Sequence, residues 1–149
     1  MQQEVKKKVW AGFWVMLLRD SKILLWRRHV DPEKASSEMN WAWTWTMPGG
    51  KLEFWESFEE GWIREVKEET WIELDNIKVI CVNNDRIETA HFVTIWMLSQ
   101  DFEGEAQVME PDEITEWKWF TLENLPENVF PPSLKLLENY KENIFYISE

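Results

Sequence analysis

The chain has 149 residues, a formal net charge of −12 and one cysteine, Cys81. This length suits one ordinary domain over residues 1–149, and the lone cysteine excludes an intramolecular disulfide and fits a reducing, cytoplasmic compartment. The negative net charge argues against a nucleic-acid partner, because a protein that binds nucleic acid needs a basic surface. The longest apolar run is too short to span a membrane. We therefore expect neither nucleic acid nor a membrane as a partner.

The first elements predict a β-hairpin. Residues 9–18 form a continuous apolar run, which is typical of a central strand covered on both faces. After a polar turn, residues 23–26 return as a second strand. The polar residues 29–40 predict a loop, and residues 44–47 form a short extended segment that ends at Pro48.

A helix is expected in the middle of the chain. Ser57 and Glu60 have the spacing of a capping box, so the helix should begin there and run to about Thr70. Residues 77–82 and 92–98 are rich in β-branched side chains and predict two more strands.

The C-terminal part predicts a strand and a helix. Residues 117–120 form the short strand, and Pro131 opens the helix, which should reach about Tyr140. Strands, a helix, further strands and a second helix together predict a mixed α/β sandwich. The leucines of the last helix that are available for the core are Leu134, Leu136 and Leu137.

Three glutamates on the predicted middle helix suggest chemistry. Glu65, Glu68 and Glu69 are spaced i, i+3 and i+4, so they share one face of the helix, while Ile63 and Val66 lie elsewhere and can anchor it in the core. Like charges this close repel one another unless a cation lies among them. Carboxylate oxygens suit Mg²⁺, with Mn²⁺ as the alternative. Taken alone, the three residues fit a solvent-exposed acidic face equally well.

A longer pattern surrounds these glutamates. Five residues separate Gly50 from Glu56, seven more separate Glu56 from Arg64, and the sequence continues Arg64-Glu65-Val66-Lys67-Glu68-Glu69-Thr70-Trp71-Ile72. This resembles the Nudix box, G-x5-E-x7-R-E-U-x-E-E-x-G-U, where U is an aliphatic residue, and all positions but one match. Residues 9–137 are similar to the nucleoside triphosphate branch of the family, which is related to MutT.

The resemblance implies a Nudix-type α/β/α sandwich around a mixed sheet, and a loop–helix–loop that binds metal ions while water attacks a phosphorus atom. The residues that match the family's machinery are Glu65, Glu68 and Glu69 as metal ligands and general base, Glu56 and Arg64 as the pair that braces them, the carbonyl of Gly49 as a backbone metal ligand, and Glu110 as one further carboxylate. Glu110 fits an ordinary loop glutamate equally well.

Four further residues are candidates for substrate binding. Arg27 and Arg28 leave the second strand toward the same end of the molecule, where they either contact phosphate or remain solvent-exposed charges. His91 and Thr94 match positions near the base pocket of this branch, although a lone histidine is more often a structural residue with satisfied hydrogen bonds.

The expected reaction is hydrolysis of a nucleoside triphosphate to a monophosphate and pyrophosphate, as in nucleotide-pool sanitising, with Mg²⁺ as cofactor. One alternative is an ADP-ribose or nucleotide-sugar pyrophosphatase that uses the same box. Another is a catalytically silent nucleotide-binding module. The partner is a small-molecule nucleotide in each case, and the sequence leaves open whether the protein is a monomer or a homodimer.

The mismatched position of the box is Trp71, where the family has glycine. That glycine usually follows the last helical turn in a left-handed conformation, which disfavours a β-carbon. The chain holds 12 tryptophans and only 5 glycines, whereas average usage of about 7% would give roughly ten glycines. We expect Trp55 and Trp71 in exposed turns; the alternative is a core that needs many rings. The tryptophans at positions where similar proteins have small residues are Trp10, Trp14, Trp26, Trp41, Trp43, Trp55, Trp62, Trp71 and Trp96, whereas Trp45, Trp117 and Trp119 fit the family pattern.

Overall fold

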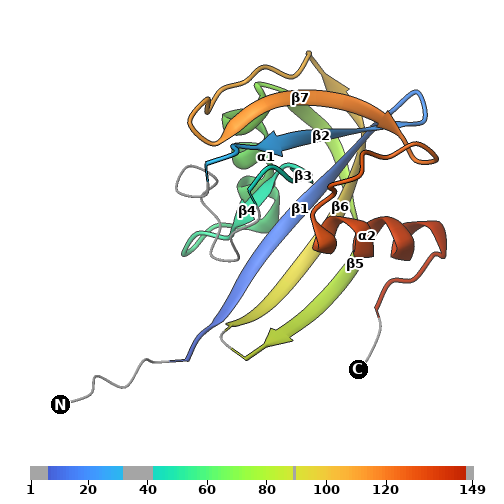
Figure 1. The fold of residues 1–149 in the computed structure, drawn as a ribbon. Coiled ribbons are helices and arrows are strands. Elements are labelled where there is room, and N and C mark those ends of the chain that lie inside the picture. Colours follow the sequence, from blue (N-terminus) through green and yellow to red (C-terminus); the bar gives the residue numbers. More distant parts are fainter. Residues whose placement is uncertain (1–6, 32–41, 89, 147–149) are drawn as a thin grey trace.

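The computed structural model describes residues 7–31, 42–88 and 90–146. Seven strands and two helices follow one another along the described chain (Figure 1). The strands are β1 (Val9–Arg19), β2 (Lys22–Arg28), β3 (Trp45–Thr46), β4 (Gly49–Lys51), β5 (Glu73–Ile87), β6 (Ala90–Glu103) and β7 (Ile114–Thr121), and the helices are α1 (Phe58–Thr70) and α2 (Pro131–Lys141).

The strands form one mixed sheet. Its order is β3-β2-β1-β6-β5, with β4 also paired to β1 and β7 also paired to β2. The long strands β1, β6 and β5 run side by side (Figure 1). β1 and β6 are parallel, with Val9 opposite His91 and Leu17 opposite Ser99, and the other pairs of strands are antiparallel. The continuous apolar run therefore forms a central strand, as predicted.

Helices cover both faces of the sheet. Side chains alternate along a strand, so β1 contributes to two separate apolar clusters. One cluster joins Phe13 to Trp62 and Val66 of α1, and the other joins Met16 to Leu136 of α2. The two helices therefore lie on opposite faces, which confirms the predicted α/β/α sandwich around a mixed sheet.

Several local predictions need correction. Ile63 and Leu134 were expected in the core but are 46% and 38% exposed. On α1, Trp62 and Val66 are one turn apart and face the sheet, which turns Ile63 toward solvent. Strand β4 follows Pro48, where the sequence indicated only a break, because it can pair with β1. Most of the predicted loop at residues 29–40 lies outside the described residues.

Strands β5 and β6 are also longer than the predicted segments, because the antiparallel pair continues beyond the β-branched part of each strand. Neither helix of the described chain is long and apolar enough to cross a membrane.

Candidate active site

The beginning and end of α1 are fixed by local hydrogen bonds. The Glu60 amide donates to Ser57 Oγ at 3.1 Å, and the Ser57 amide donates to Glu60 Oε2 at 2.8 Å, so the predicted capping box is present. At the other end the Trp71 amide donates to the Lys67 carbonyl at 2.9 Å. Trp71 itself has φ 67° and is 54% exposed, which confirms the predicted left-handed, exposed turn.

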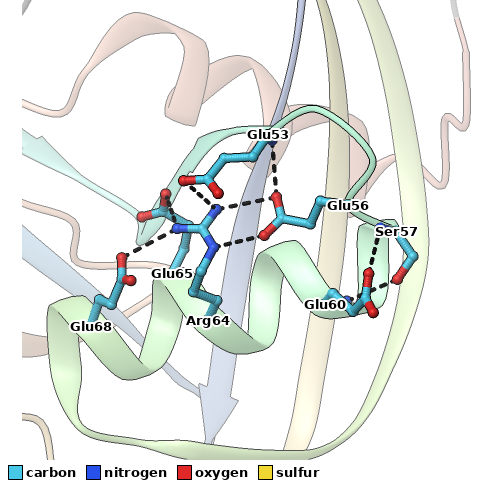
Figure 2. Close-up of polar contacts among 7 residues, drawn as sticks. All are labelled: Glu53, Glu56, Ser57, Glu60, Arg64, Glu65 and Glu68. Atoms are coloured by element: carbon cyan, nitrogen blue, oxygen red, sulfur yellow. Dashed lines mark hydrogen bonds and ion pairs between the residues drawn. The ribbon is translucent and has the colours of Figure 1, made fainter.

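Arg64 connects the acidic side chains around α1 (Figure 2). Its Nε donates to Glu56 Oε1 at 2.7 Å, and its Nη1 donates to Glu65 Oε1 at 2.9 Å and to Glu68 Oε2 at 3.2 Å. Glu53 approaches the same guanidinium at 3.7 Å. One cation therefore holds carboxylates from the helix and from the loop before it in a fixed arrangement.

Glu56 is the most strongly held partner of Arg64. Its side chain is 10% exposed and accepts two bonds from Arg64, at 2.7 and 3.2 Å, and one from the Glu53 amide at 2.9 Å. The hydrogen bond from Arg64 lowers the pKa of Glu56, so this carboxylate remains ionised. The contacts are those of a bracing pair, which is the role that the resemblance implied for Glu56 and Arg64.

Glu69 lies deeper than the other glutamates of the helix. The residue is 7% exposed, and its Oε2 accepts a hydrogen bond from the Gly49 amide at 3.1 Å. Burial raises the pKa of Glu69 well above its ordinary value, and the charge of Glu65 raises it further, while the Gly49 amide acts against them. Burial also raises the pKa of Glu65, and its bond to Arg64 opposes this effect. Despite the nearby guanidinium groups, burial leaves these two carboxyls poorly stabilised as anions.

Strand β4 comes very close to the glutamates. A β-carbon on Gly50 would lie 2.6 Å from Cδ of Glu65, and one on Gly49 would lie 2.2 Å from the Phe13 carbonyl oxygen. Real β-carbons do not approach other atoms this closely. Gly49 therefore requires glycine, because its close contact is with backbone, whereas a β-carbon at Gly50 would displace the Glu65 carboxylate. The backbone of β4 forms one wall beside the carboxylates.

Of the two candidate arginines, only Arg28 faces the glutamates. It is 7% exposed; burial lowers its pKa, while the negative charges of Glu69 and Glu113 raise it. Arg27, the neighbouring residue on β2, points to the opposite face. There it forms an ion pair with Glu116, and the ring of Trp43 lies 3.8 Å from its guanidinium carbon.

His91 and Thr94 both lie on β6. They are three residues apart on β6, so their side chains lie on opposite faces of the sheet. His91 Nε2 is 2.5 Å from Asn84 Oδ1, which satisfies one ring nitrogen within the sheet. Thr94 is 8% exposed and lies between Gly12 and Asn83 of the neighbouring strands.

Glu110 lies near the glutamates of α1. Its charge raises the pKa of both Glu65 and Glu69, and its own pKa is raised by burial and then by the charges of Glu113 and Glu68. The sequence analysis missed Glu113, whose signal was its position three residues after Glu110 in the same acidic loop, and also missed Glu53 beside Arg64.

The donor set fits a hard divalent cation, because every candidate side-chain ligand is a carboxylate oxygen. Within the described ranges, no three His, Cys, Asp or Glu side chains already converge as a metal site. Arg64 engages Glu65 and Glu68 in this conformation. A cation among Glu65, Glu69 and Glu110 would stabilise their anionic forms and so oppose the effects of burial and mutual repulsion that raise their pKa values. The residues therefore fit the metal that the Nudix resemblance implies.

Comparison with known proteins agrees with this geometry. The NUDIX domain family model matches residues 9–140. The ADP-ribose pyrophosphatase of Methanocaldococcus jannaschii is 30% identical over 124 residues, which are 82% of this chain and 67% of that protein. The crystal structure of a MutT NUDIX hydrolase from Burkholderia pseudomallei is 31% identical, with a TM-score of 0.77 over 89% of this chain and 98% of that chain. The MutT protein of Methanosarcina mazei Go1, at 24% identity and a TM-score of 0.75, covers 93% of this chain and 97% of its own and supports the fold alone.

The chain therefore belongs to the Nudix family. Members of this family hydrolyse pyrophosphate bonds in small-molecule nucleotides and generally use divalent metal ions. Within the family, the chain is of the MutT type.

Proposed function

We propose that this enzyme hydrolyses a nucleoside triphosphate to a nucleoside monophosphate and pyrophosphate, with Mg²⁺ or Mn²⁺ as cofactor. The observation that carries the proposal is the buried Glu69, with the partly buried Glu65 on the same helix face and the cationic Arg28 near Glu69, because carboxylate oxygens suit a metal ion and a guanidinium suits a phosphate. The similarity to a MutT hydrolase over 98% of its length supports the triphosphate as substrate.

In this proposal the metal ligands are Glu65, Glu68, Glu69, Glu110 and the Gly49 carbonyl. When bound, the metal neutralises phosphate oxygens and lowers the pKa of the attacking water. The oxygen of that water forms a bond to one phosphorus atom, and the phosphoanhydride P–O bond breaks, with its electron pair leaving on the departing oxygen.

The side chains of the protein supply the remaining steps. Glu65 or Glu69 accepts a proton from the water, and both are candidates because both lie at the buried end of the acidic face. Arg64 fixes the carboxylate of Glu65 through a bond of 2.9 Å, and Glu56 fixes Arg64. Arg28 pairs with a phosphate oxygen of the substrate. Arg27 does not take this role, because it pairs with Glu116 and lies against Trp43 on the opposite face of the sheet.

A second candidate substrate is ADP-ribose. The relative from Methanocaldococcus jannaschii is named as an ADP-ribose pyrophosphatase and is 30% identical, nearly the same as the MutT structure. A nucleotide sugar presents the same linked diphosphate. A third candidate, a silent nucleotide-binding module, is favoured only by Trp71 at the end of the helix that carries the glutamates.

A nucleotide panel with Mg²⁺ separates these candidates. We expect pyrophosphate and a monophosphate from at least one nucleoside triphosphate, with a kcat/KM that falls about 10² to 10⁴-fold in the Glu69→Gln variant. Release of AMP and ribose 5-phosphate from ADP-ribose, with triphosphates untouched, would assign the second activity. Tight binding without any turnover would assign the silent module. Glu59→Gln, an exposed change on the same helix, is the matched control and should keep the parent rate.

A further inference from the structure

Three tryptophans have a backbone conformation that suits glycine. Trp43, Trp55 and Trp71 have φ values of 64°, 69° and 67°. In this left-handed region the β-carbon crowds the following carbonyl oxygen, and a bulky side chain there is a marked outlier. The only other non-glycine residues with positive φ in the described chain are Asp20, Ser21 and Asn143, which are small and polar. Tryptophan thus supplies half of these positions although it is 12 of 149 residues.

Packing accounts poorly for two of these rings. Trp55 and Trp71 are 90% and 54% exposed, so much of each side chain stays in water despite the backbone strain. Trp43 is 39% exposed and its ring lies against the guanidinium of Arg27, so only its backbone argues for glycine. Trp26 and Trp62 are 4% and 3% exposed, and Trp62 Nε1 has no hydrogen-bond partner within the described residues. Their burial fits an aromatic core as well as it fits replaced glycines, so the backbone of the three positive-φ tryptophans is the more informative.

Independent mutations would not be expected to place the same bulky residue at several separate glycine positions. A single codon that is read as glycine in one genetic code and as tryptophan in another would do so. UGG is the ordinary tryptophan codon, and UGA is a stop codon that some genetic codes read as tryptophan and others as glycine. We infer that the codons for Trp43, Trp55 and Trp71 are UGA and that the cells owning this gene read them as glycine. The protein of those cells then has glycine at three positive-φ positions, including the last glycine of the Nudix box.

The remaining glycines agree with this inference. Gly49 is required by a close backbone contact and Gly104 has a φ of 102°, and both are present. A codon rule leaves every glycine with an ordinary codon unchanged, so it predicts this mixture of retained glycines and tryptophans at glycine-like positions.

The DNA of the gene is the first test. UGA is expected at the codons for Trp43, Trp55 and Trp71, and also at those for Trp10, Trp14, Trp26, Trp41, Trp62 and Trp96, of which Trp41 lies outside the described residues. UGG is expected at Trp45, Trp117 and Trp119. UGG at Trp55 and Trp71 would overturn the inference.

Thermal unfolding is the second test, and it compares glycine with alanine at each position. Both substitutions remove the indole, but only glycine removes the β-carbon. At residues 43, 55 and 71 the glycine variant should melt roughly 3 °C above the alanine variant, for a chain of this size. Trp45 is the matched control, because it is 8% exposed within β3 and its φ is not positive, so glycine there should melt at or below alanine. Equal melting temperatures for glycine and alanine at residues 55 and 71 would overturn the inference.

Discussion

The acidic face of α1 and the turns at its two ends both reduce the stability of the protein, but for different reasons. On the face, Glu65 and Glu69 have raised pKa values because they are buried beside other carboxylates. In the turns, Trp55 and Trp71 have positive φ while their rings lie largely in solvent. A cation can relieve the crowding of the glutamates, whereas no ligand relieves a β-carbon in a left-handed turn. Mutation of a glutamate on the acidic face should therefore lower turnover. Replacement of a turn tryptophan by glycine should instead raise the free energy of unfolding and leave turnover unchanged.

The largest expected effect is on catalysis. Glu69→Gln should lower kcat/KM by about 10² to 10⁴-fold, because a ligand and a candidate general base are lost together. The amide oxygen can still accept the Gly49 hydrogen bond, so the fold should persist. Steady-state kinetics with Mg²⁺ measure the change. A variant as fast as the parent would show that this face of α1 is not the catalytic one.

Loss of Arg64 should have the next largest effect. Arg64→Gln leaves Glu56 without its cation, which should reduce the free energy of unfolding by about 2 kcal/mol. Urea denaturation measures this loss. The double variant Arg64→Gln with Glu56→Gln should recover part of it, since the Glu56 carboxylate, which has the most contacts with Arg64, no longer lies unpaired, although Glu65 still lacks its partner. If the double variant is less stable than Arg64→Gln alone, the bracing contact is not the cause.

The acidic face should also produce a pH dependence in the metal-free protein. A carboxyl whose pKa is raised in the folded state binds its proton more tightly there than in the unfolded chain. Its stabilising contribution is complete below the ordinary pKa of 4.5 and is lost as pH rises through the raised value. Denaturation of the metal-free parent and of Glu69→Gln, from pH 4 to pH 8, should therefore show the variant gaining relative stability as pH rises. A constant difference across this range would contradict the raised pKa.

The smallest expected effect is in the turns, and it has the opposite sign. Trp71→Gly should increase the free energy of unfolding by about 1 kcal/mol, because it removes the left-handed penalty at the helix end. The rate of turnover should not fall, since the Trp71 ring lies under the ammonium of Lys67 and its amide bonds to the Lys67 carbonyl, and Lys67 is not a candidate site residue. Chemical denaturation and the nucleotide assay, run on the same sample, check both halves. Reduced turnover in a more stable variant would place Trp71 with the site and remove the contrast.

Features that depend on neighbours within a turn or two could be predicted from the order of residues. The capping box at Ser57, the end of α1 at Thr70 and the left-handed turn at Trp71 are set by local hydrogen bonds and by the β-carbon. The shared face of Glu65, Glu68 and Glu69 follows from helical period. Strand alternation likewise places His91 and Thr94 on opposite faces of the sheet.

The tertiary structure decided which distant groups meet. Arg28 rather than Arg27 faces Glu69 because the register of β2 in the sheet turns alternate side chains toward α1. Gly49 reaches Glu69 only because β4 pairs with β1, and Glu113 joins the site from a loop 44 residues after Glu69. These contacts depend on how strands pair and helices pack across the sheet. Period and propensity describe one segment at a time and carry no information about that pairing.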